Sequence, residues 1–117
     1  MGKLADQAVN NHRNYHSCSA AVLCAFHEMA GLSEQQAEKE AAPFASGRAG
    51  KCGAVMAAEY VLKQVYNKDA EGKIAEFEKK FMNHHKGSVM CHDLMGSCRA
   101  CVTDAALILE DTLEQPD

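Results

Sequence analysis

The pattern of apolar and polar residues predicts a chain built from helices. An apolar run over residues 17–30 ends at Gly31, a residue that commonly stops a helix. Ser33, followed three positions later by Gln36, forms the signature of a capping box and predicts a second helix. Pro43 closes that helix because proline cannot continue the backbone hydrogen bonds.

Three more helices are expected over residues 52–66, 71–85 and 98–114. In each, apolar residues recur at the spacing of one helical face: Val55, Ala58, Leu62 and Val65; Ile74, Phe77 and Phe81; Val102, Ala105, Ala106, Leu109 and Leu113. Glu59 and Glu110 are expected on the polar faces. Residues 86–97 form a turn-rich connector, and the chain shows no internal repeat or linker. The sequence therefore predicts one all-α domain over residues 1–117, a compact bundle of four to five helices with its core at about 14–113.

Composition and charge narrow the function. A chain of 117 residues can build one hydrophobic core without obligatory cross-links. The net charge of −4, without a run of Lys or Arg, argues against a nucleic-acid binder. The chain lacks the roughly 20 consecutive apolar residues of a membrane span, and its N-terminus is polar where a signal peptide is apolar. We therefore expect a soluble cytoplasmic protein that binds neither nucleic acid nor membrane.

The positions of the cysteines give the main chemical clue. Cys18, Cys52 and Cys98 each fall in the first turn of an expected helix, and Cys91 lies in the turn-rich connector. Helix starts carry unpaired backbone N–H groups and the positive end of the dipole, which favour thiolates and anionic clusters. In a reducing compartment, clustered cysteines more often bind metal or do redox chemistry than form structural disulfides. These four thiols are therefore candidates for one shared site.

Other candidates have simpler interpretations. Cys24 lies among apolar residues in mid-helix, where cysteine packs as a small hydrophobe. Cys101 stands one turn after Cys98, and the spacing leaves open whether it takes part directly or only adjoins the site. His92 could add a ligand, although a histidine in a polar turn is more often solvated. The pair at 84–85 ends a charged helix, where imidazolium suits the dipole.

The segments "SCSAAVLCAF", "CGAVMAAEYVL", "CHDLMG" and "CRACVTDAALIL" together resemble the C-GCAxxG-C-C family, described as redox-active. The resemblance covers nearly the whole chain and implies a four-cysteine site at Cys18, Cys52, Cys91 and Cys98. Cys98 is the fourth because the family cysteine precedes a Val-x-Asp-Ala-Ala segment by four residues. Ala57 stands where the family motif ends in glycine. A similar domain accompanies split-Soret cytochromes, where it is associated with an iron–sulfur centre.

Three functions follow from these residues. The favoured one is a small redox protein in which Cys18, Cys52, Cys91 and Cys98 hold an iron–sulfur cluster for electron transfer or redox sensing, with a redox partner protein. A thiol–disulfide oxidoreductase would instead use Cys98 and Cys101. The third is a structural or carrier zinc site. Enzymatic activity and the formation of a homodimer are left open.

Overall fold

The computed structural model describes residues 3–14, 16–47, 50–85, 87–90 and 98–114, which form helices joined by short turns. The elements are α1 (Lys3–Arg13), α2 (Cys18–Ala25), α3 (Glu34–Ala41), the 3₁₀ helix η1 (Ala42–Gly47), α4 (Gly53–Tyr66), the 3₁₀ helix η2 (Asn67–Asp69), α5 (Ala70–His84) and α6 (Cys98–Glu114). Among these residues the β-pairing is limited to an isolated antiparallel bridge between Lys51 and Met90. The all-α prediction is confirmed.

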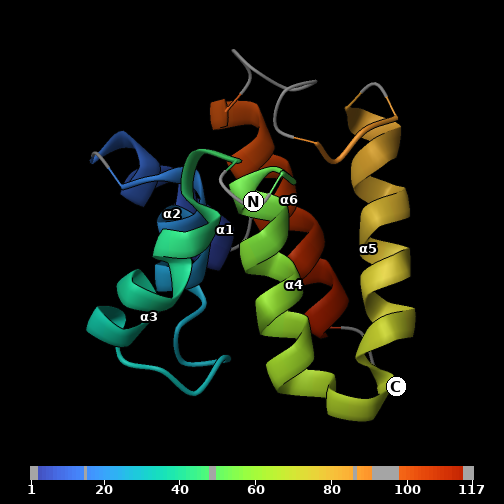
Figure 1. The fold of residues 1–117 in the computed structure, drawn as a ribbon, viewed down its shortest axis with the longest axis horizontal. Helices are drawn as coiled ribbons and strands as arrows, with labels where there is room; N and C mark the ends of the chain where they lie inside the picture. Colours follow the sequence, from blue (N-terminus) through green and yellow to red (C-terminus); the bar gives the residue numbers. More distant parts are fainter. Residues whose placement is uncertain (1–2, 15, 48–49, 86, 91–97, 115–117) are drawn as a thin grey trace.

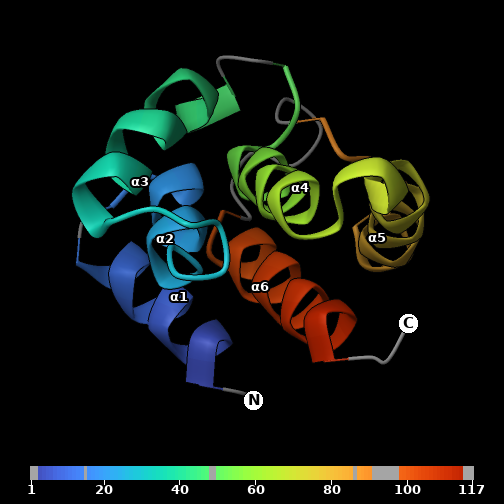
Figure 2. The same ribbon diagram turned by 90° about the horizontal axis from the view of Figure 1, so that it is seen from below.

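Helices α1, α2 and α3 lie on one side of the molecule and α4 and α5 on the other, with α6 running behind α4 (Figures 1 and 2). α2 packs against α1, α3, α4 and α6, while α4 also contacts α5 and α6. The largest fully buried side chains come from both groups: Leu23, Phe26, Leu62, Phe77, Phe81 and Leu109. α2 is therefore buried almost all round, which explains its run of apolar residues.

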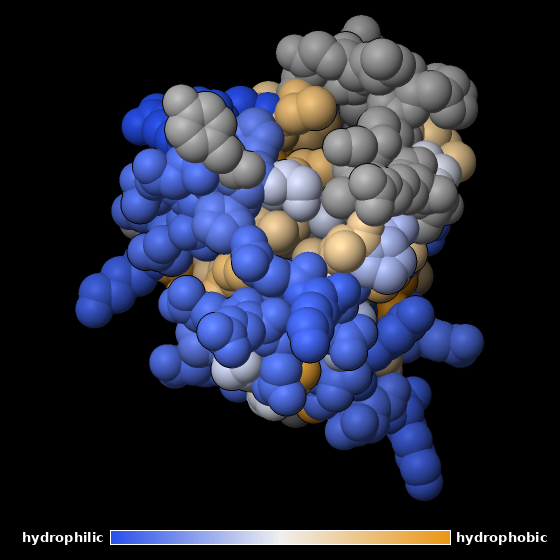
Figure 3. All heavy atoms as spheres, turned by 60° about the vertical axis from the view of Figure 1, so that its left-hand side comes forward, coloured by the Kyte–Doolittle hydropathy of each residue, from blue (hydrophilic) through white to orange (hydrophobic). Residues whose placement is uncertain are grey.

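The outer face of the α1–α3 group is mostly hydrophilic, with smaller apolar areas between the polar side chains (Figure 3). Among the described residues, no helix combines the length and the apolar character that crossing a bilayer requires.

Helix α1 adds to the five helices expected from the sequence. It buries only alanines, Ala5 and Ala8, so its local apolar signal is weak. Its first turn is completed from the far end of the chain, because the carboxylate of Glu110 accepts hydrogen bonds from the backbone N–H groups of Leu4 and Ala5 at 3.2 and 3.3 Å. A carboxylate at this end also suits the helix dipole. Both contacts are tertiary, and the local sequence could not reveal them.

Helix α2 is shorter than expected, since it ends at Ala25 rather than Ala30. The residues that follow form a turn in which the N–H of Leu32 donates to the carbonyl of His27 at 2.9 Å. Gly31 completes the turn with a φ of 73°, a conformation that glycine adopts without steric cost. The apolar sequence extends past the end of the helix because Phe26 and Ala30 are buried in the turn that follows. This explains why the predicted helix was too long.

The remaining elements follow the predicted bounds within one or two residues. Ser33 and Gln36 form the predicted capping box at the start of α3. The segment directly after α3 forms the 3₁₀ helix η1, which includes Pro43. Val65 was expected on the apolar face of α4 and is 37% exposed.

The expected polar-face positions of Glu59 and Glu110 are wrong. Both side chains are buried, with residue exposures of 6% and 9%. Glu110 is held by the start of α1, and Glu59 pairs with Lys51. A buried carboxylate is stable only with such partners.

Candidate functional site

Cys18 and Cys52 come together where the starts of α2 and α4 pack against each other. Cys18 is the first residue of α2, whose N-cap Ser17 accepts the N–H of Ala20, and Cys52 immediately precedes α4. Gly53 allows the approach: a Cβ there would lie 2.6 Å from Sγ of Cys18 and 2.8 Å from the carbonyl oxygen of Phe44. Phe44 belongs to η1, and the same Cβ would lie 3.2 Å from the backbone N of Ser19 in α2, so a side chain at position 53 would force the start of α4 away from both elements.

Cys101 of α6 also contacts Cys52. A hydrogen bond from the Cys101 thiol is the main cause that lowers the pKa of Cys52 to about 6, against the opposing effect of burial. The backbone N–H groups of Val55 and Ala54, at the start of α4, lower it further. The same hydrogen bond, together with burial, raises the pKa of Cys101. The pair therefore carries a thiolate at Cys52 near neutral pH and a protonated thiol at Cys101.

Cys98 lies one turn before Cys101, at the first residue of α6, and is exposed. It is close enough that its charge raises the pKa of Cys101. Three helix starts thus bring Cys18, Cys52 and the Cys98–Cys101 turn to one end of the bundle. Cys101 is buried, with 1% of its surface exposed.

Cys91 and His92, both named as candidate ligands from the sequence, lie outside the described residues. The strand-like segment before them is described, and it runs beside Cys52. The N–H of Cys52 donates to the carbonyl of Val89 at 2.7 Å. Met90, the residue that precedes Cys91 in the sequence, forms the antiparallel bridge with Lys51, the residue that precedes Cys52.

A partly buried charge cluster flanks Cys52, in which Glu59 is the most buried member. Lys51 donates to both carboxylate oxygens of Glu59 at 3.3 Å and to Oε2 of Glu78 at 2.6 Å. Burial, and the neighbouring carboxylate of Glu78, raise the pKa of Glu59 to about 7, although Lys51 opposes the shift. A hydrogen bond from Glu59 lowers the pKa of Glu78. This cluster ties α4 and α5 to the residue next to the low-pKa thiolate.

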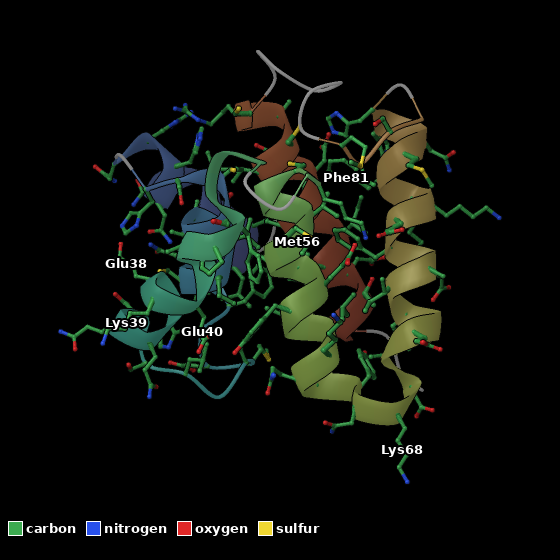
Figure 4. The ribbon with its side chains drawn as sticks, viewed as in Figure 1. Glu38, Lys39, Glu40, Met56, Lys68 and Phe81 are labelled. Atoms are coloured by element: carbon green, nitrogen blue, oxygen red, sulfur yellow. The ribbon has the colours of Figure 1, made fainter. Side chains whose placement is uncertain are left out.

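A second polar contact braces the start of α6. Nε2 of His85 lies 2.6 Å from Oδ2 of Asp104, and the imidazole stacks on Phe81 at 4.5 Å between ring centroids. Phe81 lies between α5 and α6 (Figure 4). His85 is buried, so its role differs from that of His84, which is exposed at the end of α5. Asp104 also helps to raise the pKa of Cys101, three residues earlier on α6.

Cys24 does not join this group. It is buried in α2, and burial together with Glu38 and Glu34 raises its pKa to about 11. Its Sγ lies 3.8 Å from the carbonyl oxygen of Glu34. Two of its polar neighbours, Glu34 and Glu38, therefore come from α3.

Three features of the site were missed or left open by sequence reasoning. The spacing did not decide the role of Cys101, whose thiol contacts Cys52. The glycine motif drew attention to position 57, but Ala57 is simply buried, and the close approach falls at Gly53. The pairing of Lys51 with Glu59, eight residues apart, was not predicted. A charge directly before a helix-start cysteine could have suggested it.

Comparisons with known proteins agree with the cysteine pattern. Residues 16–112 match the model of the family described as "Putative redox-active protein (C_GCAxxG_C_C)". The matched segment covers most of the chain and includes all six cysteines. The searches of curated proteins and of solved structures found no match.

Proposed function

The chain belongs to the C_GCAxxG_C_C family of redox-active proteins, and from that premise we propose that it holds an iron–sulfur cluster on Cys18, Cys52, Cys91 and Cys98. The observation that carries the proposal is the meeting of three helix starts at which cysteines lie. Thiolates are the ligands of such clusters, and the protein sets the reduction potential through nearby hydrogen bonds, charge and solvent exposure. The cluster would supply one-electron chemistry, in exchange with a redox partner protein.

The described residues fit such a group in three respects. Cys52, with its pKa lowered to about 6, is already a thiolate at neutral pH. The N–H groups of Ala54 and Val55 point at its sulfur and compensate negative charge without a dedicated cation. Gly53 leaves room for Cys18 beside it. Cys101, in contact with Cys52, would then be a neighbouring thiol or an alternative ligand to Cys98.

A second candidate function is supported by the contact between Cys52 and Cys101. A low-pKa thiolate beside a protonated thiol is the arrangement of a thiol–disulfide oxidoreductase. The Cys52 thiolate would attack an acceptor disulfide, which releases one acceptor thiolate and joins Cys52 to the acceptor in a mixed disulfide. Cys101 would then lose its proton and attack the sulfur of Cys52, which releases the second acceptor thiolate. This leaves a Cys52–Cys101 disulfide and a fully reduced dithiol acceptor. The sequence-based version of this function paired Cys98 with Cys101, whereas the contact favours Cys52 as the partner.

Single Ser substitutions at Cys18, Cys52, Cys91, Cys98 and Cys101 separate the two functions. After anaerobic reconstitution, we expect loss of iron, sulfide and visible absorbance from the first four variants, because serine is a poorer ligand for iron than thiolate. Cys24→Ala is the matched control and should keep the cluster. If no variant changes the iron content, and only the Cys52 and Cys101 variants lose the ability to form the reversible disulfide, the cluster assignment is wrong.

A further inference from the structure

A group of side chains with metal-ligand atoms, apart from the cysteines described above, lies where α2 and α3 meet. It consists of His16, in the segment before α2, Cys24 in α2 and Glu38 in α3. The three ligand atoms lie within 4.8 Å of one another. Nδ1 of His16 already approaches Oε1 of Glu38 at 3.0 Å. Three residues from three segments of the chain thus converge on one point.

The geometry points to a Zn²⁺ site formed by His16, Cys24 and Glu38. Zinc bonds of about 2.0–2.3 Å in a tetrahedron require ligand atoms about 3.3–3.7 Å apart. The observed separations are short enough that small side-chain rotations bring the three atoms to these distances. A site with one sulfur, one nitrogen and one oxygen ligand suits zinc, whereas Mg²⁺ and Ca²⁺ prefer oxygen ligands alone.

The three proposed ligands differ in their exposure to solvent. Cys24 is 6% exposed, so its sulfur would hold the metal from the protein side. The side chains of His16 and Glu38 are 31% and 57% exposed, which gives the ion a path from solvent. Glu38 projects from the side of α3 in Figure 4. Three protein ligands leave a fourth position for water, as in zinc sites that bind or activate a small molecule.

The charges around Cys24 also favour a cation. The charge of Glu34 also acts on Cys24, and this carboxylate approaches Nε2 of His27 at 3.9 Å. Ionised Cys24 and Glu38 would balance the two charges of Zn²⁺, and binding would release the thiol proton of Cys24 to solvent. The site is separate from the cysteine group at the starts of α4 and α6, and it does not depend on the proposed cluster.

Titration of the reduced chain with Co²⁺, a spectroscopic substitute for Zn²⁺, tests the site. Wild type should bind one equivalent more than Cys24→Ala, with thiolate-to-metal charge-transfer absorbance that Zn²⁺ displaces. The equivalent should persist in Cys52→Ser, which alters the other group. His16→Asn, at a half-buried position, and Glu38→Gln, at an exposed one, should each lower its affinity at least about tenfold.

Two matched variants control for surface effects. They are Glu40→Gln, at an exposed position of α3, the helix that also carries Glu38, and His84→Asn, at the exposed end of α5. Both should bind Co²⁺ as wild type does, and circular dichroism should show every variant folded. Equal Co²⁺ binding by wild type and Cys24→Ala overturns the site. So does unchanged affinity in both His16→Asn and Glu38→Gln, because the metal would then use the cysteine alone.

Discussion

Gly53→Ala places a methyl group where α2 and α4 touch. The added Cβ would lie 2.6 Å from Sγ of Cys18 and 2.8 Å from the carbonyl oxygen of Phe44, both closer than real Cβ contacts. This oxygen is backbone of η1, and the added Cβ would also lie 3.2 Å from the backbone N of Ser19 in α2. Neither atom can rotate away as a side chain does, so the start of α4 must shift away from η1 and α2. Since Cys18 and Cys52 lie at the starts of α2 and α4, the substitution should disturb the cysteine group and the stability together.

The magnitude follows from two opposing effects. Overpacking of a close contact costs about 1–3 kcal/mol, and the higher helix propensity of alanine returns up to about 1 kcal/mol. Gly53 does not have a positive φ, so no backbone strain is added. We expect a net loss of about 1–2 kcal/mol. For 117 residues, with an unfolding entropy of about 2.1 cal/mol/K per residue, this lowers the Tm by about 4–8 °C.

The assay is thermal and urea unfolding of Gly53→Ala beside a matched control. Gly72→Ala makes the same change in α5, where an added Cβ meets nothing within 4 Å. The control should gain about 0.5–1 kcal/mol, because alanine is the better helix former. Reconstituted Gly53→Ala should also hold less iron than wild type. If the two variants shift stability in the same direction, or Gly53→Ala binds iron normally, the close approach at Gly53 does not shape the site.

Three further predictions concern single side chains. Alkylation of Cys52 in the metal-free chain, followed by peptide mass spectrometry, should rise through about pH 6, because its thiolate forms there; in the urea-unfolded chain the rise should move toward pH 9, and identical profiles would contradict the contact with Cys101. As pH rises from 4.5 to about 7, folded Glu59 keeps a proton that the unfolded chain releases, so stability falls. Glu59→Gln should remove about 3 kcal/mol of that fall relative to the exposed control Glu71→Gln, and matching pH profiles of the two variants would refute the raised pKa. Cys24→Ala should lower the free energy of unfolding by about 1 kcal/mol and leave iron content unchanged; loss of iron would show that the ligands are wrongly assigned.

The sequence predicted α3 to α6 well because each carries its own signals. The capping box at Ser33 and the 3.6-residue spacing of apolar residues in α5 and α6 are local, and they matched the structure. Helix α1 had no comparable signal, because the Glu110 carboxylate that completes its first turn comes from the other end of the chain. The predicted helix was extended to residue 30 because buried residues beyond Ala25, such as Phe26 and Ala30, are apolar, although the backbone there forms a turn.

The cysteine group could be predicted only in part. Helix-start positions singled out Cys18, Cys52 and Cys98 before any contact was known. Which sulfur lies against Cys52 depends on how α6 packs on α4, and sequence spacing does not contain that information. The group of His16, Cys24 and Glu38 was missed for the same reason. Cys24 looked like a core residue, and its neighbours come from segments that meet only in the folded chain.

Iron and acid-labile sulfide, measured per chain in protein purified and reconstituted without oxygen, test the central claim most directly. A cluster on four thiolates predicts near-stoichiometric iron and sulfide with visible absorbance that bleaches on reduction. Protein that holds neither iron nor sulfide, and forms a reversible disulfide between Cys52 and Cys101 instead, would contradict the cluster and leave thiol–disulfide exchange as the function.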